Sequence, residues 1–417
     1  MSEWIVPPGL IMMAGAVLLP VLPRKLRSLW FIVTSLAALA AVFSIPEGTN
    51  LAVNFLEYRL VVVKMDALSR LFGIIFAFIA LVGGIYSFHV KEVGQQMAAL
   101  LYAGSALGVT FAGDFFTLFV CWEIMALTST YLVWARRTKE AQRAGLRYLL
   151  YHVLAGGLLF MGSLWHLSTP GRDLLVSPMT PDMGVSAWLI LLGVMINGAV
   201  PPLHTWLPDA YPQATVTGAV FMSAFTTKVS VYLLARMFPG WEILLVIGTI
   251  MILYGIIYAI LANDIRGILS YHIISQVGYM VAGVGIGTVM GINGAVSHAF
   301  NNILFKSALF MGTGLVLFTT GTGKLTELGG LLKKQRLAFW LYMIAGFSIS
   351  GVPLFNGYIS KSMTVAAAGE AHHAWVVLLM NLAAIGTFLS VGLKLPYFTW
   401  VANEKEKTNT KHNLRMQ

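Results

Sequence analysis

The stretch VMINGAVPPLHTWLPDAYPQATVTGAVFMSAFTTKVSVYLLAR, Val194 to Arg236, decides the fold class of this chain. It is apolar enough to enter a bilayer, yet Pro201-Pro202 and Pro208 interrupt it. A membrane helix breaks only where the freed backbone groups are covered by protein or line a wet cavity. Ionisable groups at that depth are costly and mark ion or proton pathways. The stretch therefore predicts a transporter with its conduction site at this break.

The composition of the whole chain indicates a membrane protein. Of 417 residues, 58% are hydrophobic and 11% are charged, whereas soluble domains carry roughly 25% charged residues. The apolar residues come in blocks of about twenty, the length that crosses a hydrocarbon core. We therefore predict an all-α polytopic membrane protein. The spanning candidates, about thirteen by the same length criterion, are approximately 4–23, 27–45, 67–89, 97–113, 114–135, 146–167, 186–207, 214–236, 241–262, 267–289, 291–319, 336–359 and 373–396.

The formal charge of +10 follows the positive-inside pattern and does not indicate a nucleic-acid partner. Loops after even-numbered candidates hold few basic residues, namely Arg59, Lys64 and Arg172. Loops after odd-numbered candidates hold Arg24, Lys25, Arg27, Lys91, Arg136, Arg137, Lys139, Arg143, Arg266, Lys324, Lys333, Lys334, Arg336, Lys405, Lys407 and Lys411. This bias predicts an N-terminus outside and a cytoplasmic C-terminus. Met1 to Leu22 is expected to be a first spanning helix instead of a signal peptide, because positive charges follow it.

Two interruptions of the apolar pattern resemble each other. One is Asn197–His204, NGAVPPLH, and the other is Ser348–Lys361, SISGVPLFNGYISK. Paired broken helices, one in each half, indicate a site built at an inverted repeat. We therefore predict one membrane domain over residues 1–417. Its parts are N-terminal helices in 1–95, a first inverted repeat in 96–236, a second in 241–396 and a polar cytoplasmic tail in 397–417.

Two isolated ionisable residues lie deep in apolar segments. Glu123 stands in DFFTLFVCWEIMALTSTYLVW, where a carboxyl group must be neutral or paired. The alternative is a purely structural hydrogen bond, which a glutamine would make at lower cost. Lys228 stands in AFTTKVSVYLL without a charged neighbour. Burial favours the neutral amine that a proton carrier needs. Snorkelling is the alternative, but Arg236 already occupies the end of that helix.

A polar stripe is predicted further along the chain. His298, Asn302 and Lys306 are spaced four residues apart, so they share one helix face. Such a stripe can hold water and relay protons, with histidine titrating nearest neutrality. A packed polar seam is the alternative. His272, with Ser275 and Gln276, forms a shorter stripe of the same kind.

Metal and cofactor sites are not expected. His272 and His298 have no carboxylate or second histidine within a helical turn, so metal binding is not predicted there. The single cysteine, Cys121, excludes an internal disulfide, a thiolate zinc site and a cysteine-ligated iron–sulfur cluster.

Four further residues have open roles. Lys361 follows the second interruption, so it faces the same cavity or a membrane boundary. Lys394 precedes Leu395-Pro396, where anchoring and conduction are both compatible with its position. His204 could bridge two half-channels beside the first interruption. Asp209 is expected to start a helix after a loop.

Five motifs along the chain resemble those of a known family. FTLFVCWEIMALTSTYLV, VPPLHTWLPDAYPQA, FTTKVSVYLLAR, NDIRGILSYHIISQVGYM and HAFNNILFKSALF are similar to the proton-conducting antiporter-like membrane subunits. These belong to Mrp-type sodium/proton antiporters, respiratory complex I and membrane-bound hydrogenases. The match runs from about Asp66 to Lys394. Within the family, YHIISQVGYM, GYISKSM, AAAGEAHHAW and GTFLSVGLKLPYFTW most resemble the D-type antiporter subunit.

The resemblance implies fourteen helices with two inverted five-helix repeats, each containing a broken helix. It implies a partner carboxylate at Glu123 and central proton carriers, which are Lys228, His298, Lys306 and Lys361. Two departures stand out. The family usually has a lysine where this chain has Asn197, so His204 or Lys228 must substitute or the first half-channel does not conduct. The chain also ends soon after its thirteenth candidate, so the family's last helix is expected to be absent.

These observations predict a subunit of a multisubunit cation (Na⁺)/proton antiporter in a bacterial or archaeal cell membrane. The proposed proton axis consists of Glu123, Lys228, His272, His298, Lys306 and Lys361, with Asn197, His204 and Lys394 as further candidates. The expected partners are other subunits, the bilayer, protons and Na⁺. No enzyme activity and no cofactor of its own are expected. The alternatives are a proton-pumping subunit of a quinone oxidoreductase or hydrogenase, and a degenerate scaffold.

Overall fold

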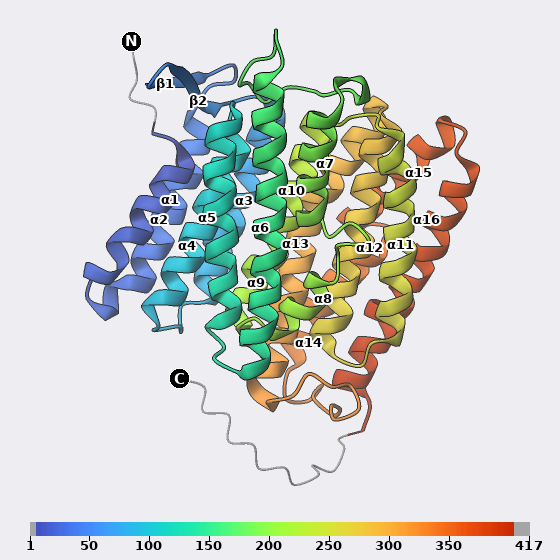
Figure 1. Ribbon diagram of the computed structural model, residues 1–417. Coiled ribbons are helices and arrows are strands. Elements are labelled where there is room, and N and C mark those ends of the chain that lie inside the picture. Colours follow the sequence, from blue (N-terminus) through green and yellow to red (C-terminus); the bar gives the residue numbers. More distant parts are fainter. Residues whose placement is uncertain (1–5, 404–417) are drawn as a thin grey trace.

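The structure, a computed structural model, describes residues 6–403 as an array of helices that stand side by side (Figure 1). The α-helices are α1 (Pro8–Leu18), α2 (Arg24–Ser44), α3 (Ala67–Tyr86), α4 (Val93–Phe111), α5 (Phe115–Trp134), α6 (Lys139–Ser168), α7 (Val185–Asn197), α8 (Trp206–Ala210), α9 (Val216–Ala224), α10 (Thr226–Met237), α11 (Glu242–Leu261), α12 (Ile265–Ile286), α13 (Val289–Thr320), α14 (Arg336–Ser350), α15 (Asn356–Glu370) and α16 (Ala374–Thr387). The strands are β1 (Asn50–Phe55) and β2 (Tyr58–Lys64).

The helices form thirteen columns when segments on either side of a break are joined, as α7 with α8, α9 with α10, and α14 with α15. Within the described part of the chain, eight helical segments are individually long and apolar enough to span a bilayer, and the others are shorter or more polar. The predicted all-α polytopic membrane fold is therefore confirmed. In the proposed repeat units, columns 4–8 and 9–13, the fourth column is broken each time.

Three details differ from the sequence prediction. The twelfth candidate, 336–359, continues as α15 to Glu370, because the chain resumes its helix after the break. The last column also continues through π-helical turns at Phe388–Lys394 and Tyr397–Val401, beyond the predicted end at 396. The tail therefore starts later than residue 397. Its residues 404–417, with Lys405, Lys407 and Lys411, lie outside the described residues.

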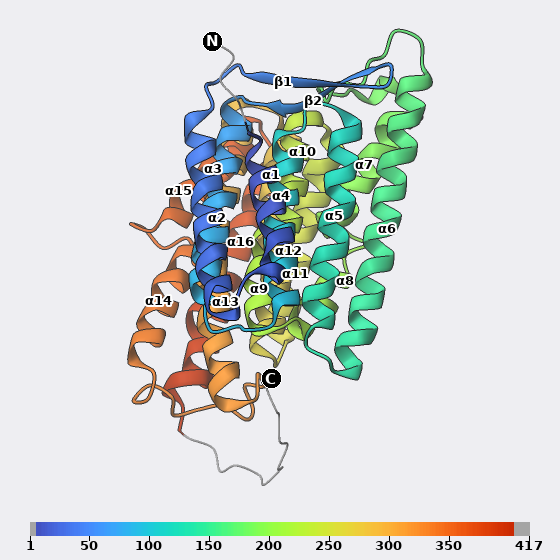
Figure 2. The same ribbon diagram turned by 90° about the vertical axis from the view of Figure 1, so that its left-hand side faces the viewer.

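A β-hairpin that the sequence did not predict covers one end of the array (Figure 2). Its strands β1 and β2 pair antiparallel, and the backbone N–H of Gly113 donates to the carbonyl of Val61 at 2.8 Å. The Phe55 ring stacks on Phe116 with centroids 5.8 Å apart. The hairpin thus seals the junction between α4 and α5, where two helices would otherwise end in open backbone groups.

Loops that follow odd-numbered columns lie at one end of the array, and loops that follow even-numbered columns lie at the other. Arg136 Nη1 donates to the carbonyl of Pro212 at 2.6 Å, and Arg266 donates to the same carbonyl. These two bonds join three loops that follow odd-numbered columns. At the other end, the N–H of Val176 donates to the carbonyl of Gly113 at 2.9 Å. The basic loops therefore share one end, as alternate crossing requires. Which end faces the cytoplasm stays a prediction.

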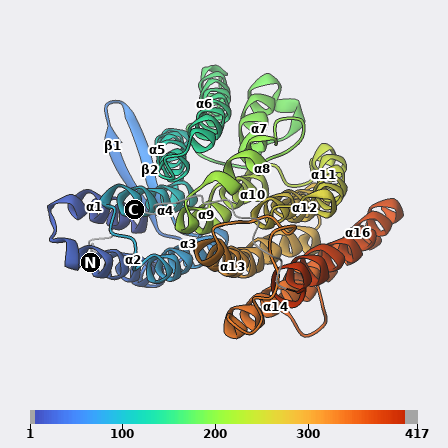
Figure 3. The same cartoon turned by 90° about the horizontal axis from the view of Figure 1, so that it is seen from below.

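Columns α9–α10, α12 and α13 occupy the middle of the array, with α1 and α2 at one edge and α16 at the other (Figure 3). The segment Val216–Met237 is fully enclosed by protein. In α12, all residues except Tyr271 and Ile286 are buried. Columns α9–α10 and α12 are thus shielded by protein, so polar side chains on them can be satisfied internally, whereas α13 keeps an exposed side at Leu315 and Phe318.

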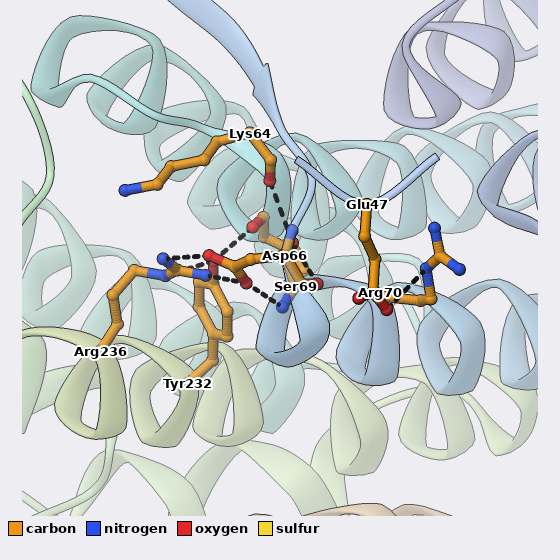
Figure 4. A network of polar contacts seen from close by, with 8 residues as sticks. Glu47, Lys64, Asp66, Ser69, Arg70, Tyr232 and Arg236 are labelled. Atoms are coloured by element: carbon orange, nitrogen blue, oxygen red, sulfur yellow. Dashed lines mark hydrogen bonds and ion pairs between the residues drawn. The ribbon is translucent and has the colours of Figure 1, made fainter. Parts of the chain in front are cut away.

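An ion pair fastens α10 to α3 at the hairpin end (Figure 4). Both Arg236 amino groups donate to the two oxygens of Asp66, at 2.8 and 2.7 Å, and Arg236 Nε donates to the Tyr232 hydroxyl at 2.7 Å. Asp66 also caps α3 by accepting from the Ser69 N–H at 2.9 Å. The Tyr232 hydroxyl in turn donates to the carbonyl of Thr110 in α4. One carboxylate thus positions three columns.

Replacing Asp66 with asparagine is expected to lower the melting temperature of the detergent-solubilised protein at neutral pH. Burial alone would raise the pKa of the Asp66 carboxyl. The contacts with Arg236 and Ser69 lower this pKa by more than burial raises it, so it lies below its ordinary value of 3.8. Its contribution to stability is present above that value and disappears as pH falls through the folded pKa. With 39% of the side chain exposed, we expect about 1 kcal/mol.

Differential scanning fluorimetry from neutral pH down to pH 3 measures this effect. The gap between wild type and Asp66→Asn should shrink below about pH 4. Glu327→Gln is the control, because its ion pair with Lys324 is solvent-exposed and should matter little. An equal melting temperature for Asp66→Asn and wild type at neutral pH would refute the role of this ion pair.

Candidate functional site

His298 joins three helices in the second half of the molecule. Its Nε2 lies 3.1 Å from Gln276 Oε1 of α12, and its Nδ1 lies 2.9 Å from the Ser360 hydroxyl of α15. An amide oxygen only accepts, so Nε2 of the neutral ring donates to Gln276 and Nδ1 accepts from Ser360. All three side chains are fully buried. The imidazole therefore has a donor side and an acceptor side within one polar cluster.

Lys361 lies next to this cluster at the second helix break. Its Nζ donates to the carbonyl of Ile349 at 2.6 Å and stands 5.1 Å from the centre of the Tyr279 ring. Ile349 lies in the last turn of α14, where carbonyls have no intrahelical partner. The side chain is buried, at 5% exposure. Lys361 is thus inside the protein at the break, and not at a membrane boundary.

Lys228 stands in the same relation to a different break. The column α9–α10 is interrupted at Phe225, and Lys228 Nζ donates across it to the carbonyl of Ser223 at 2.8 Å. The side chain has no exposed surface, so it does not snorkel. Both lysines therefore bind a carbonyl at the C-terminal end of the preceding half-helix, where the helix dipole favours a cation.

The predicted stripe on α13 faces the interior. His298, Asn302 and Lys306 are all fully buried. Lys306 Nζ donates to the carbonyl of Leu269 in α12 at 2.9 Å. His272, also on α12, contacts the Ser390 hydroxyl at 2.7 Å. The stripe thus lines the contact between α12 and α13, two of the central columns.

Several buried polar atoms in this region have no hydrogen-bond partner among the described residues. They include both amide atoms of Asn302, the Nε2 of Gln276 and the hydroxyls of Thr227, Ser275 and Ser307. Leaving such an atom dry costs about 1–3 kcal/mol. Buried water commonly satisfies these groups. The interior between α10, α12 and α13 is therefore rich in polar groups.

Glu123 departs from the prediction of a buried axis. The residue is partly exposed on α5, and no hydrogen bond joins it to another predicted site residue in the described chain. Its carboxyl packs on α6, because a Cβ atom at Gly156 would lie only 1.7 Å from Oε1. The structure thus separates Glu123 from the central cluster. Its carboxyl occupies the space that a side chain at position 156 would fill, and we call this space the cradle of Glu123.

The remaining candidates have different surroundings. Asn197 is fully buried at the end of α7 with both amide atoms unpartnered among the described residues. His204 packs edge-on against Tyr254, with ring centroids 4.4 Å apart. Lys394 donates to the carbonyls of Ile260 and Ala262 at 2.6 and 2.7 Å, so it caps the end of α11. This contact favours the anchoring role for Lys394.

Asp209 stands in the first turn of α8, as predicted for a helix start, but it does not cap the helix. It lies within α8 and forms a two-pronged ion pair with Arg147 of α6, at 2.7 and 2.8 Å. The sequence could not indicate this partner, because 62 residues separate the two side chains. The pair attaches the short helix after the first break to α6.

Sequence reasoning missed a chain of hydroxyl groups in the first half. The Tyr102 hydroxyl lies 2.5 Å from Thr226 Oγ1, the Tyr148 hydroxyl lies 3.3 Å from the same atom, and Tyr148 donates to Ser129 at 2.9 Å. His152 stacks on Tyr148 with ring centroids 3.9 Å apart. The signal was present, since residues 148, 152 and 156 share the four-residue spacing that revealed the α13 stripe.

A family model described as NADH:quinone oxidoreductase/Mrp antiporter, transmembrane region, matches residues 112–387. The chain belongs to this family. It is 34% identical over 278 residues to the D-type Na⁺/H⁺ antiporter subunit of Alkalihalophilus pseudofirmus, in an alignment that covers 63% of this chain. The chain spans only 56% of that relative's length.

Solved structures of antiporter-like chains have the same fold. A chain of the Mrp complex from Dietzia sp. superposes with a TM-score of 0.84 at 21% identity, covering 97% of this chain and 83% of that one. A chain of respiratory complex I from Thermus thermophilus gives 0.85 at 22% identity, covering 96% and 90%. At these identities the likeness establishes the architecture alone.

Gly357→Ala is expected to destabilise the second break. A Cβ at Gly357 would lie 1.8 Å from the carbonyl oxygen of Ser348, so the start of α15 would have to move away from the end of α14. Overpacking against backbone typically costs about 1–3 kcal/mol. Gly369→Ala, on the same helix, is the matched control, because its Cβ would meet only Val377 at 3.9 Å.

Thermal unfolding of the purified protein distinguishes the two variants. Gly357→Ala should melt several degrees below wild type, since about 1 kcal/mol shifts the melting temperature by a few degrees. Gly369→Ala should match or exceed wild type, because alanine favours a helix over glycine by about 1 kcal/mol. Equal melting temperatures for the two variants would contradict the close approach at the break.

Proposed function

We propose that this chain is a subunit of a multisubunit monovalent cation (Na⁺)/proton antiporter in a bacterial or archaeal cell membrane, and that it conducts protons through its interior. The observation that carries the proposal is the cluster of Gln276, His298, Ser360 and Lys361 at the second helix break. It combines two protonatable groups with a donor–acceptor pair, fully inside a membrane fold. The similarity to a D-type Na⁺/H⁺ antiporter subunit supports the choice of reaction.

The proton path would use the buried bases in turn. A neutral lysine takes up a proton, and the resulting ammonium is held by the carbonyl it already contacts, Ile349 for Lys361 and Leu269 for Lys306. Buried groups that interact titrate as a coupled set, so a proton arriving on one group promotes release from its neighbour. His298 can receive a proton on Nδ1 and release one from Nε2. Lys228 and His272 extend the path through α10 and α12.

The cation path is proposed to lie partly in another subunit. Sodium binds to carboxylate, carbonyl and hydroxyl oxygens, the ligands of hard cations. Among the described residues, Asp114 is the only fully buried carboxylate, and it caps α5 by accepting from the Thr117 N–H at 2.8 Å. The exposed face of Glu123 offers a further carboxylate at the surface between α5 and α6. We therefore infer that partner subunits complete the transporter.

A redox-driven proton pump is the second candidate, favoured by the matching family model, whose description names NADH:quinone oxidoreductase beside the Mrp antiporter. Such a protein needs no redox centre of its own. Purification of the complex decides between the two. If flavin or iron–sulfur subunits co-purify in stoichiometric amounts, the protein is a subunit of a redox-driven pump and the antiporter proposal is overturned.

Lys361→Ala and Glu123→Gln are expected to slow cation/proton exchange by the assembled complex in vesicles. Loss of a group that transfers a proton typically costs at least about tenfold. Exchange is measured as dye-reported dissipation of a pH gradient on addition of Na⁺. Lys139→Ala is the control, since this lysine is at the start of α6, outside the proposed path. Wild-type rates in both variants would defeat the proposed proton path.

The cradle around Glu123 allows a second test with a matched pair. Gly156→Ala is expected to reduce exchange, because its Cβ would displace the Glu123 carboxyl. Gly157→Ala adds the same methyl group one residue along, where nothing lies within 4 Å, and should exchange at the wild-type rate. The ratio of the two initial rates is the measurement. A ratio near one would show that the packing of Glu123 against α6 does not matter for exchange.

A further inference from the structure

We propose that His152 of α6 is the proton-relay residue of the first half of the protein, in the role that Asn197 cannot fill. The inference rests on the proposed antiport function and adds a residue to its proton path. An asparagine amide does not take up a proton, and Asn197 is completely buried at the end of α7. A basic group must therefore take up the proton near the first break if this half conducts, and His152 is one that the sequence did not indicate beside His204 and Lys228.

The contacts of His152 leave one ring nitrogen free to act as a base. Its Nδ1 lies 2.8 Å from the carbonyl oxygen of Tyr148, which can only accept, so Nδ1 carries the hydrogen in the neutral ring. The Nε2 therefore presents its lone pair. That atom is buried and has no hydrogen-bond partner among the described residues. A histidine whose sole purpose was packing would not need an unpartnered polar atom in the interior.

His152 lies next to the cradle of Glu123. Gly156, whose Cβ position would collide with the Glu123 carboxyl, is one helical turn further along α6 on the same face. Residues four apart on a helix are about 5–6 Å apart at Cβ. In the proposed path, water carries the proton from the Glu123 carboxyl to the imidazole. The proton then leaves the Glu123 carboxyl and bonds to Nε2, giving a carboxylate and an imidazolium.

On its other side, His152 borders the hydroxyl chain. Its ring stacks on Tyr148, and the Tyr148 hydroxyl contacts Thr226. Thr226 begins α10 directly after the break at Phe225, across which Lys228 bonds Ser223. The imidazolium releases the proton again from Nε2, because Nδ1 is bonded to a backbone carbonyl, and the hydroxyls of Tyr148 and Thr226 can pass it toward the break by exchanging donor and acceptor roles. His152 therefore connects the partly exposed carboxylate with the central lysine.

The ring of Trp206 places His152 beside the first break as well. Its centroid is 4.6 Å from that of His152, and its Nε1 donates to the carbonyl of Ile196, the residue before Asn197. Trp206 also lines a surface pocket of about 290 Å³ together with Arg147, Tyr151, Thr205 and Asp209. The Trp206 indole thus contacts His152, the pocket and the broken helix that carries Asn197.

The test uses the assembled complex in vesicles and the cation/proton exchange rate. His152→Asn keeps a donor for the carbonyl four residues earlier, as Asn381 does on α16 at 2.8 Å, but removes the base. We expect exchange to fall by at least about tenfold. Adding Asn197→Lys to this variant supplies a base at the break and should restore the rate to within about threefold of wild type. His166→Asn, another buried histidine of α6, is the control and should retain the wild-type rate.

The rescue distinguishes proton relay from packing. A wild-type rate in His152→Asn overturns the proposal, and so does a loss that Asn197→Lys fails to restore. If the His152→Asn complex does not assemble, His152→Gln is measured in the same way, and failure of both to assemble assigns His152 to packing. The parent proposal fails separately, when the wild-type complex shows no cation-dependent exchange or when Lys361→Ala leaves the rate unchanged.

Discussion

Every break in a membrane helix leaves backbone carbonyls that hydrocarbon cannot satisfy. In this protein, the amines of Lys228 and Lys361 bind such carbonyls, at Ser223 and Ile349 respectively. The Ser230 hydroxyl does the same for Val194 near the end of α7. The groups that allow the helices to break are thus largely the groups proposed to carry protons. Removing a lysine therefore affects both the backbone and the proposed path.

This dependence explains the arrangement of the array. The broken column α9–α10 and the neighbouring α12 are enclosed by other columns, so their polar side chains meet protein and water instead of lipid. The two halves nevertheless differ. The second has His298 bound on both nitrogens beside Lys361. The first has a partly exposed Glu123, an uncharged Asn197 and a chain of hydroxyl groups that leads to the break at Phe225.

The sequence by itself determined the membrane fold, the number of columns and the position of both predicted breaks. Hydrophobic block length sets the number of crossings, and proline at Pro201-Pro202 and Pro353 prevents a continuous helix. Four-residue spacing placed His298, Asn302 and Lys306 on one face, and the structure turns this face inward. These features depend on local chemistry and on the thickness of a bilayer, so a single chain read in order reveals them.

Only the tertiary structure decided which side chains meet. Glu123 was expected in the buried axis, but it lies partly exposed against Gly156, because a glycine on a different helix provides the space. Lys394 caps α11 across 132 and 134 residues of sequence, and Asp209 pairs with Arg147 for a similar reason. His152 meets Trp206 of α8, and the Tyr148 beside it reaches Thr226 of α10, contacts that the four-residue spacing along α6 does not reveal. Contacts between columns depend on packing, which spacing along one helix does not encode.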